Sequence, residues 1–325
     1  MNNNVDKHDI CLELFDRYIS DDQTPIHLVS SHWKNLHQEL VVTEKNGEIE
    51  SVKDMGFGDM SQRGFLVKLL SYVTVLIYIL KLPHRSEIIN LIKVARCVCV
   101  RMGISFSYDC FRQTCSLRLI REYATAKEKF VCLIIGDGYG FLSCFIKELY
   151  PECQIILIDL GKTLLFQAKN CQQAFPSARH GLIGSLGSRG MEGADFIYCP
   201  AEHIDSIEKS THIHWAINIA SMQEMNIETI DRYFHFLRKI LAPDNLFYCC
   251  NRKEKTMPGG EISRFYDYPW NANDEHLIDD ECPWHIFFLS LGKVKKELTF
   301  FGIPVPFVKY FDGQHFHRLS HLAVK

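Results

Sequence analysis

Residues 130–159 read FVCLIIGDGYGFLSCFIKELYPECQIILID, and this stretch decides the fold. A short apolar run, Phe130–Ile135, is followed at once by the glycine cluster Gly136–Gly140. Phe141–Tyr150 then has a helical pattern, and Ile155–Ile158 is a second apolar run. This order predicts a strand, a tight glycine turn, a helix and a second strand, which is the repeating unit of an open α/β sheet.

The same alternation continues and extends the prediction to a whole domain. Helical patterns cover Lys162–Phe175 and Ile227–Leu241. Further apolar runs predict strands at Asp195–Cys199, His214–Ile219 and Leu246–Cys250, with late strands near His285–Leu289 and Leu319–Val324. Short apolar strands separated by helices indicate parallel strands buried on both faces. Right-handed crossovers then give a Rossmann-like, doubly wound, mostly parallel sheet, an α/β fold.

Residues 1–124 have a different hydrophobic pattern, which is mostly helical and lacks the alternation typical of strands. We expect them to form an N-terminal helical region before a Rossmann-like domain of residues 125–325. Lys45–Arg63 is rich in glycine and charge and predicts a loop or hinge. Phe65–Leu80 is nearly apolar but shorter than the roughly 20 residues that a membrane span needs. A buried helix is the preferred interpretation, and an interfacial helix that touches a membrane is the alternative.

Composition narrows the class of protein. The 325 residues carry a net charge of −3, which gives no sign of a nucleic-acid partner. The 13 cysteines are odd in number and include no CxxC pair, which argues against a disulfide framework or a zinc site, and no metal is expected. The first residues, MNNNVDKHDICLELF, do not resemble a secretory signal. We therefore expect a cytoplasmic protein.

The glycine turn indicates the cofactor. It consists of Gly136, Asp137, Gly138, Tyr139 and Gly140, a GxGxG spacing between a predicted strand and a predicted helix. Glycines there let the backbone turn tightly and approach a ligand. A dinucleotide fingerprint would need its third glycine one position later. With its flanking strand and helix, the turn favours a nucleoside-type cofactor, and S-adenosyl-L-methionine has no pyrophosphate that would need the third glycine. The alternative is a structural turn in another α/β domain.

Other strand ends complete the expected cofactor site. Asp159 ends the second strand, where an acidic residue can accept both ribose hydroxyls, with Leu160 beside it. The alternative for Asp159 is a helix N-cap. The fourth strand leads into Ala220 and Ser221, which we expect beside the cofactor.

Several polar and aromatic residues further along the chain are suited to contact an acceptor substrate. We expect substrate contacts from Gln223, Asn251, Arg252, Tyr268, Trp270 and Trp284. The preferred general base is His285, with Glu224 as the other choice and His317, in the run Gln314–Arg318, ranked next. Two alternatives remain open: Glu224 as a first-turn residue of the next helix, and the carboxylates of Asp279–Glu281 as ligands of a divalent metal rather than a solvated face.

Four segments resemble the sugar O-methyltransferases of bacterial surface-polysaccharide loci. They are LIIGDGYGFLSCFIKELYP with IILIDL, NIASMQEMNIETIDRYF, LFYCCNR and DECPWH, and SSHWKNLHQEL adds a fainter likeness. The resemblance implies methyl transfer from S-adenosylmethionine to a hydroxyl of a sugar or glycan, and an N-terminal helical cap over the acceptor. The family usually has an acidic residue two positions before the first glycine, where this chain has Ile134.

Three rival classes follow from the same residues. The first is a non-catalytic binding module that keeps the fold, because of Ile134. The second is an NAD-dependent oxidoreductase, although no Tyr-x-x-x-Lys pair follows the fourth strand. The third is a methyltransferase that acts on a small molecule or a protein.

Overall fold

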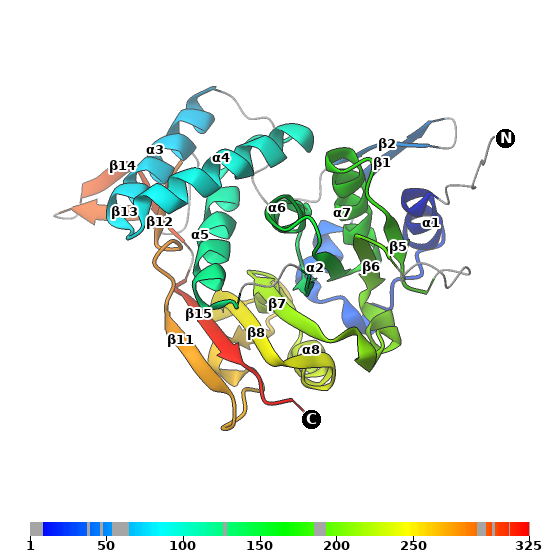
Figure 1. The fold of residues 1–325 in the computed structure, drawn as a ribbon. Coiled ribbons are helices and arrows are strands. Elements are labelled where there is room, and N and C mark those ends of the chain that lie inside the picture. Colours follow the sequence, from blue (N-terminus) through cyan, green and yellow to red (C-terminus); the bar gives the residue numbers. More distant parts are fainter. Residues whose placement is uncertain are drawn as a thin grey trace.

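The computed structural model describes residues 9–37, 40–45, 48–53, 65–125, 129–184, 193–290, 297–300, 303–311 and 313–324. Its centre is an eight-stranded sheet (Figure 1). In spatial order the strands are β11 (Glu275–Glu281), β15 (His315–His321), β8 (Leu241–Arg252), β7 (Ile213–Ile219), β3 (Val131–Ile135), β4 (Gln154–Asp159), β6 (Phe196–Pro200) and β5 (His180–Leu182). From β8 to β5 every neighbouring pair is parallel, whereas β15 runs antiparallel to β8 and β11. The predicted Rossmann-like, mostly parallel sheet is confirmed.

Helices cover both faces of the sheet. They are α6 (Phe141–Leu149) and α7 (Gly161–Ala174) on one face and α8 (Ile227–Ile240) on the other. Along β3, Cys132 and Ile134 join the buried cluster that contains α6 and α7, whereas Leu133 and Ile135 join the cluster that contains α8. Successive side chains of a strand point to opposite faces, so a strand covered on both sides is apolar throughout.

The order of the strands defines where a ligand binds. The chain winds outward from β3 to β4 and β6 on one side, and then crosses to β7 and β8 on the other. The winding therefore reverses between β3 and β7. In open α/β sheets, ligands bind outside the carboxyl ends of the strands at such a switch point.

The late strands depart from the predictions. β12 (Phe287–Leu289) does not extend the main sheet, but joins a separate sheet with β14 (Ile303–Tyr310) and β13 (Glu297–Phe300). β15 begins at His315 rather than near Leu319. The predictions missed β5 and β11, and also the small hairpin of β9 (Glu254–Thr256) and β10 (Ile262–Arg264). These strands are short or polar, so hydrophobic periodicity does not reveal them.

The N-terminal part contains helices and one hairpin. Its elements are α1 (Ile10–Phe15), the π-helix η1 (Asp16–Ser20), the 3₁₀-helix η2 (Ile26–Leu28), α2 (Ser31–Leu36), β1 (Val41–Lys45), β2 (Glu48–Lys53), α3 (Phe65–Lys81), α4 (Arg85–Arg101) and α5 (Tyr108–Tyr123). The β1–β2 hairpin corrects the prediction of a loop from Lys45 onward, and residues 54–63 of that loop lie outside the described residues. The sequence GLIGSLGSRG of Gly181–Gly190 predicts a loop between helix and strand; β5 includes its first two residues, and residues 185–190 lie outside the described residues.

The N-terminal part shares a core with the sheet. One buried cluster includes Leu14 of α1, Phe111 of α5 and Phe145 of α6 together with residues of β3 and β4. At the start of α7, Gly161 leaves room for the ring of Tyr18, because a Cβ there would lie 2.2 Å from the ring. Remaining short 3₁₀ turns are η3 (Ala201–Ser206), η4 (Lys209–Thr211), η5 (Met222–Glu224) and η6 (Phe265–Asp267).

Helix α3 forms as predicted, but the prediction that it is buried holds only for its inner face. Val75 and Tyr78 are buried, and the Tyr78 hydroxyl donates a hydrogen bond to the Phe287 carbonyl. Phe65, at the start of the helix, is 83% exposed. The helix lies at the periphery, where α4, α5 and β12 contact it from one side (Figure 1). Within the described ranges, no helix is long and apolar enough to cross a membrane.

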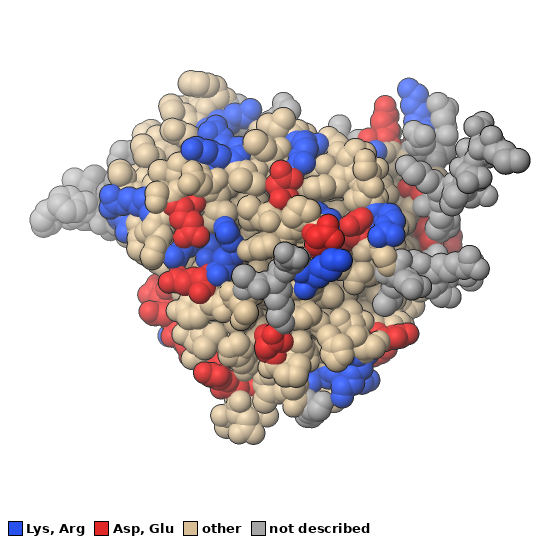
Figure 2. Space-filling model, in the orientation of Figure 1, with Lys and Arg blue, Asp and Glu red and all other residues tan. Residues whose placement is uncertain are grey.

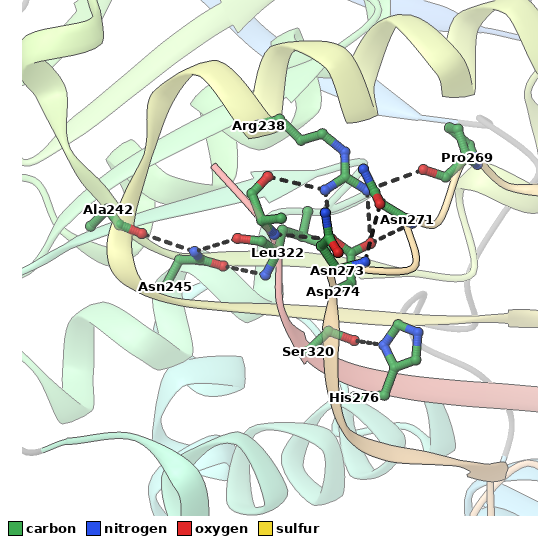
Figure 3. Close-up of polar contacts among 11 residues, drawn as sticks. Arg238, Ala242, Asn245, Pro269, Asn271, Asn273, Asp274, His276, Ser320 and Leu322 are labelled. Carbon is green, nitrogen blue, oxygen red and sulfur yellow. Dashed lines mark hydrogen bonds and ion pairs between the residues drawn. The ribbon is translucent and has the colours of Figure 1, made fainter. Parts of the chain in front are cut away.

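A buried ion pair fastens α8 to the C-terminal end of the chain. The Arg238 guanidinium donates to both carboxylate oxygens of Asp274, at 2.6 and 2.7 Å, and to the carbonyls of Pro269 and Ala323 (Figure 3). Asp274 also accepts a hydrogen bond from the Ala323 amide. The Asp274 side chain is fully buried, and these bonds tie the loop before β11 and the segment after β15 to α8.

Replacing Arg238 with alanine is expected to lower the free energy of unfolding by about 3–5 kcal/mol, because it strands a buried carboxylate. Burial raises the pKa of Asp274, but the hydrogen bonds from Arg238, Asn271 and Ala323, together with the charge of Arg238, outweigh this and the pKa is lowered. The stabilisation is therefore present above the pKa of unfolded aspartate and is lost as the pH falls through the lower folded pKa. Urea unfolding of the wild type and of Arg238→Ala at several pH values measures the loss of unfolding free energy and its dependence on pH. Arg264→Ala breaks an exposed pair with Glu254 and should change stability little; an equal loss would contradict the assignment.

Candidate functional site

A cavity of about 330 Å³ opens at the carboxyl ends of β3, β4 and β7. This volume is in the range of small-molecule sites. Its lining combines the glycine turn, the ends of these strands, the N-terminal segment around η2 and α2, and one end of α5. Of the nine residues predicted to contact a cofactor, the cavity is lined by Gly136, Asp137, Gly138, Tyr139, Asp159, Leu160, Ala220 and Ser221. Gly140 lies behind them as the N-cap of α6.

The glycine turn is fixed by close packing against the loop after β7. Gly136 has a φ of +75°, and a Cβ there would lie 2.2 Å from the Ser221 Oγ. Ser221 Oγ in turn donates to the Ile135 carbonyl at 3.0 Å. Only glycine fits this position, and the contact brings the ends of β3 and β7 together at the cavity wall.

Asp137 caps helix α6. Its carboxylate accepts hydrogen bonds from the Leu142 and Ser143 amides at 3.1 and 2.9 Å, and from the Ser143 hydroxyl. Burial raises the pKa of Asp137 to about 6, and the three donors oppose that rise. The N-terminal amides of α6 therefore already have an anionic acceptor from the chain itself.

Asp159 ends β4 and is not a helix N-cap. Its Oδ1 accepts from the Leu160 amide at 2.8 Å and its Oδ2 from Gln167 Nε2 at 2.7 Å. Leu160 is the N-cap residue of α7 and makes no capping side-chain bond. Burial raises the pKa of Asp159 to about 7. A carboxylate with lone pairs to spare thus faces the cavity at the end of the second parallel strand.

Amide side chains hold the loop after β7 against β8. Asn251 Nδ2 donates to Asn218 Oδ1 at 2.8 Å, and the backbone N–H of Gln223 donates to Asn251 Oδ1 at 3.0 Å. The Arg252 amide donates to Gln223 Oε1 at 2.7 Å. Asn251 is therefore a buried support, while Gln223 and Arg252 line the cavity.

Glu224 lines the cavity as half of a charged pair. Lys255 Nζ donates to its Oε1 at 2.6 Å, and His32 Nε2 lies 3.3 Å from its Oε2. Burial disfavours the charged carboxylate, but these two partners outweigh it and lower the pKa of Glu224. Because both oxygens of this carboxylate have a partner, Glu224 serves better to bind or to balance charge than to take a proton.

The far end of the cavity carries a second group of polar side chains. Helix α5 contributes Asp109, Arg112 and Gln113, and Phe311 and His315 come from either side of the turn between β14 and β15. Arg112 forms an ion pair with Asp109, and its guanidinium lies over the Phe311 ring, 5.0 Å from the ring centre. Hydrogen-bond donors and acceptors surround an aromatic face here.

His315 presents a neutral imidazole to the cavity. Burial, followed by the charges of Arg112 and Arg252, lowers the pKa of His315 well below its usual value. Its Nδ1 is buried and has no hydrogen-bond partner among the residues that the structure describes. The imidazole that lines the cavity is therefore neutral, which is the form that can accept a proton.

The histidines predicted as bases lie deeper. His285 is buried behind His315, with ring centres 4.5 Å apart, and its Nδ1 is 3.1 Å from the Cys282 Sγ. His317 hydrogen-bonds the Tyr248 hydroxyl at 3.2 Å. Neither residue lines the cavity. In the β15–β8 register, His315 pairs with Arg252 at the end of β8, whereas His317 pairs with Cys250, two residues further into the sheet.

The aromatic residues predicted to contact an acceptor lie in the core. Trp284 is buried, and its indole N–H donates to the Ser116 hydroxyl at 3.2 Å. Tyr268 and Trp270 pack on the face of the sheet that α8 covers, where Trp270 contacts Phe234 of α8 with ring centres 4.8 Å apart. Apolar packing takes these rings away from the cavity, which corrects the expectation that they form its wall.

The carboxylates of Asp279–Glu281 do not gather around one point. They lie on the edge strand β11, whose side chains alternate between faces, and Asp279 pairs with Arg318. Among the described residues, one group has three atoms suited to a metal within 4.8 Å of one another: Cys250, Cys282 and His285. Burial raises the pKa of Cys282 well above its usual value, so it is a protonated thiol, which hydrogen-bonds His285 Nδ1.

Sequence reasoning missed the residues that other elements bring to the cavity. Besides His315 they include Leu28, Trp33, Asp109, Arg112, Gln113 and Phe311. Leu28 and Trp33 form a small buried cluster with Leu160, which lays the N-terminal segment over the start of α7. The signals were faint: a polar Asp-x-x-Arg-Gln near the start of α5, and a histidine two positions before His317, which was ranked below His285.

Comparison with known proteins gives limited similarity. No family model matches the sequence, and no curated protein matches it. A phosphoethanolamine N-methyltransferase 2 of Haemonchus contortus, solved with S-adenosyl-L-methionine, is 16% identical over 42% of this chain and 27% of that chain, with a TM-score of 0.31. An S-adenosylmethionine-dependent methyltransferase of Anabaena variabilis is 12% identical over 65% and 84% of the two chains, with a TM-score of 0.40.

A TehB-like S-adenosylmethionine-dependent methyltransferase of Corynebacterium glutamicum is 12% identical over 64% of this chain and 86% of that chain, with a TM-score of 0.37. The match to the Haemonchus enzyme spans less than a third of that enzyme's length. Similarities of this size leave the activity and the substrate to be argued from the chain's own residues.

Proposed function

We propose that this protein is an S-adenosylmethionine-dependent methyltransferase that acts on a hydroxyl group of a sugar or glycan. The cofactor half of the proposal rests on the glycine turn, Asp159 and the cavity that they border. The acceptor half rests on the polar groups at the far end of the cavity and on the resemblance to sugar O-methyltransferases.

The observation that carries the choice of cofactor is the cap on α6. A dinucleotide seats its pyrophosphate on the free amides at the N-terminus of the helix after the first strand. Here the Asp137 carboxylate already accepts two of those amides, and a phosphate would meet its negative charge. S-adenosylmethionine carries no phosphate and a positive sulfur, so it suits a turn closed by a carboxylate.

The residues that line the cavity have separate proposed roles in binding the cofactor. Asp159 would accept the ribose hydroxyls, and the backbone of Gly136–Gly138 would lie against the cofactor, since a side chain at Gly136 would collide with Ser221. Leu28 and Trp33 would cover the bound molecule and exclude water. When bound, S-adenosylmethionine supplies an electrophilic methyl group on a positively charged sulfur.

At the acceptor end, His315 is the proposed general base. A sugar hydroxyl is a poor nucleophile at neutral pH, so its proton must leave as the oxygen attacks. Neutral His315, which lines the cavity, can take that proton on its imidazole, and His285 behind it would hold the ring by stacking. Phe311 offers an aromatic face for the CH groups of a sugar, and Gln113 and Arg112 offer polar atoms for its hydroxyls.

The experiment for this proposal is a methyl-transfer assay with isotopically labelled S-adenosylmethionine. Candidate acceptors are nucleotide-linked sugars, free oligosaccharides, small alcohols and peptides, each with mass spectrometry of the product. Label in an O-methyl sugar supports the proposal. Label in a peptide or a non-sugar alcohol would keep the methyltransferase and overturn the acceptor.

Affinity for S-adenosylmethionine is expected to depend on pH through Asp159. The ribose hydroxyls donate to the ionised carboxylate, and the pKa of this group is raised to about 7. Protonation below that pH should weaken binding, by about tenfold between pH 8 and pH 6. Calorimetric titration over this range measures the change. Asp159→Asn should flatten the profile; a slope that persists would point to Asp137, whose pKa is raised to about 6.

A further inference from the structure

Helix α3 carries an apolar stripe on its outward face. Five large side chains recur at helical spacing along it: Phe65, Leu69, Tyr72, Leu76 and Leu80. Phe65 is 83% exposed and the other four are between 44% and 58% exposed. These positions lie on one side of the helix, opposite the buried Val75 and Tyr78. A soluble helix normally turns charged residues outward, so the stripe marks a contact surface.

The charge around the stripe is one-sided. The segment from α3 through α4 contains six lysines and arginines and a single acidic residue, Glu87. The cations are Lys68, Lys81, Arg85, Lys93, Arg96 and Arg101, all exposed, and of these Arg101 is paired with Glu148 of α6. Figure 2 shows mostly blue side chains along the upper edge of the molecule, over the α3–α4 region of Figure 1.

We infer that this face, the α3 stripe with its cations, docks on an anionic lipid surface. Apolar side chains of a helix lying in the membrane plane enter the boundary of the acyl chains, and flanking cations meet lipid phosphates. Lys68 stands beside the stripe, and Lys81 and Arg85 lie at its C-terminal end, where their long side chains reach the headgroups. Tyr72 suits the same interface, with an apolar ring and a polar tip.

Charge also argues against a second copy of the chain as the occupant. In a twofold interface the same patch meets itself, so the basic band of one copy would face that of the other. Like charges at close range disfavour that contact, whereas each Lys or Arg near an anionic membrane adds about fivefold to affinity. The surface is separate from the cavity residues, so its role does not depend on the proposed reaction.

The test is flotation of the full chain with vesicles of phosphatidylcholine, alone and mixed with phosphatidylglycerol. The wild-type protein should bind the anionic vesicles, bind neutral ones weakly, and detach as the salt concentration rises. The double variant Leu69→Gln/Leu76→Gln should reduce binding at least about tenfold, since both positions are exposed and the change opens no core. Ile262→Gln, a change at a comparably exposed residue of β10, should bind like wild type.

Two further readouts separate the outcomes. Thermal unfolding should give the same midpoint for the double variant as for wild type, which shows that the variant folds. Absence of wild-type binding to anionic vesicles at low salt would overturn the inference. So would equal binding by the double variant, or a wild-type dimer in sedimentation that the double variant dissolves, which would assign the stripe to a second copy.

Discussion

Replacing His315 with glutamine is expected to lower the rate of methyl transfer by about a hundredfold or more while leaving the affinity for S-adenosylmethionine unchanged. Glutamine keeps much of the volume and a polar end, but it cannot take a proton from a hydroxyl. General bases contribute about 10²–10⁴ in rate, which sets the size of the effect. The measurement pairs a turnover assay with calorimetric binding of the cofactor.

Two other histidines make the comparison specific. His235→Gln alters an exposed residue of α8 and should leave the rate unchanged. His285→Gln removes the ring stacked behind His315 and should give a smaller loss, since it acts only through position. A normal rate in His315→Gln together with a severe loss in His285→Gln would return the role of base to His285.

Replacing Asp159 with alanine is expected to weaken S-adenosylmethionine binding by about a hundredfold, because two hydrogen bonds to a charged group are lost. The change also frees the Leu160 amide and Gln167, which pair with this carboxylate. Thermal unfolding of the ligand-free variant therefore belongs beside the calorimetric titration, to show that the fold remains.

Asp205→Ala is the matched control for this change. Asp205 is an exposed carboxylate that pairs with Arg232 outside the cavity, so its loss should leave cofactor affinity unaltered. Wild-type affinity in Asp159→Ala would place the ribose elsewhere. It would also remove the main reason for assigning β4 to the cofactor site.

The predictable parts of the fold are those that depend on short-range sequence patterns. The strand, turn and helix around Gly136 follow from an apolar run, glycines and a change of period, all within thirty residues of sequence. Asp159 and Ser221 could be assigned because they end strands, and the carboxyl ends of parallel strands meet at one edge. These assignments do not require knowing which elements, distant in the sequence, pack around the cavity.

The acceptor end was not predictable in this way. Arg112 and Phe311 lie in segments far apart in the sequence and meet only through the packing of α5 against the C-terminal strands. His315 and His317 share one face of β15, and the choice between them depends on the register with β8. Tyr268 and Trp270 sit among polar residues in the sequence, yet they pack against α8.

The central claim is that the cavity at β3 and β4 binds S-adenosylmethionine. The most direct measurement is isothermal titration of the purified protein with S-adenosylmethionine, S-adenosylhomocysteine and NAD in turn. Micromolar binding of the first two, and none of NAD, is the predicted result. Binding of NAD would overturn the argument from the Asp137 cap, and binding of none of the three would favour a non-catalytic module in which Ile134 marks a lost cofactor site.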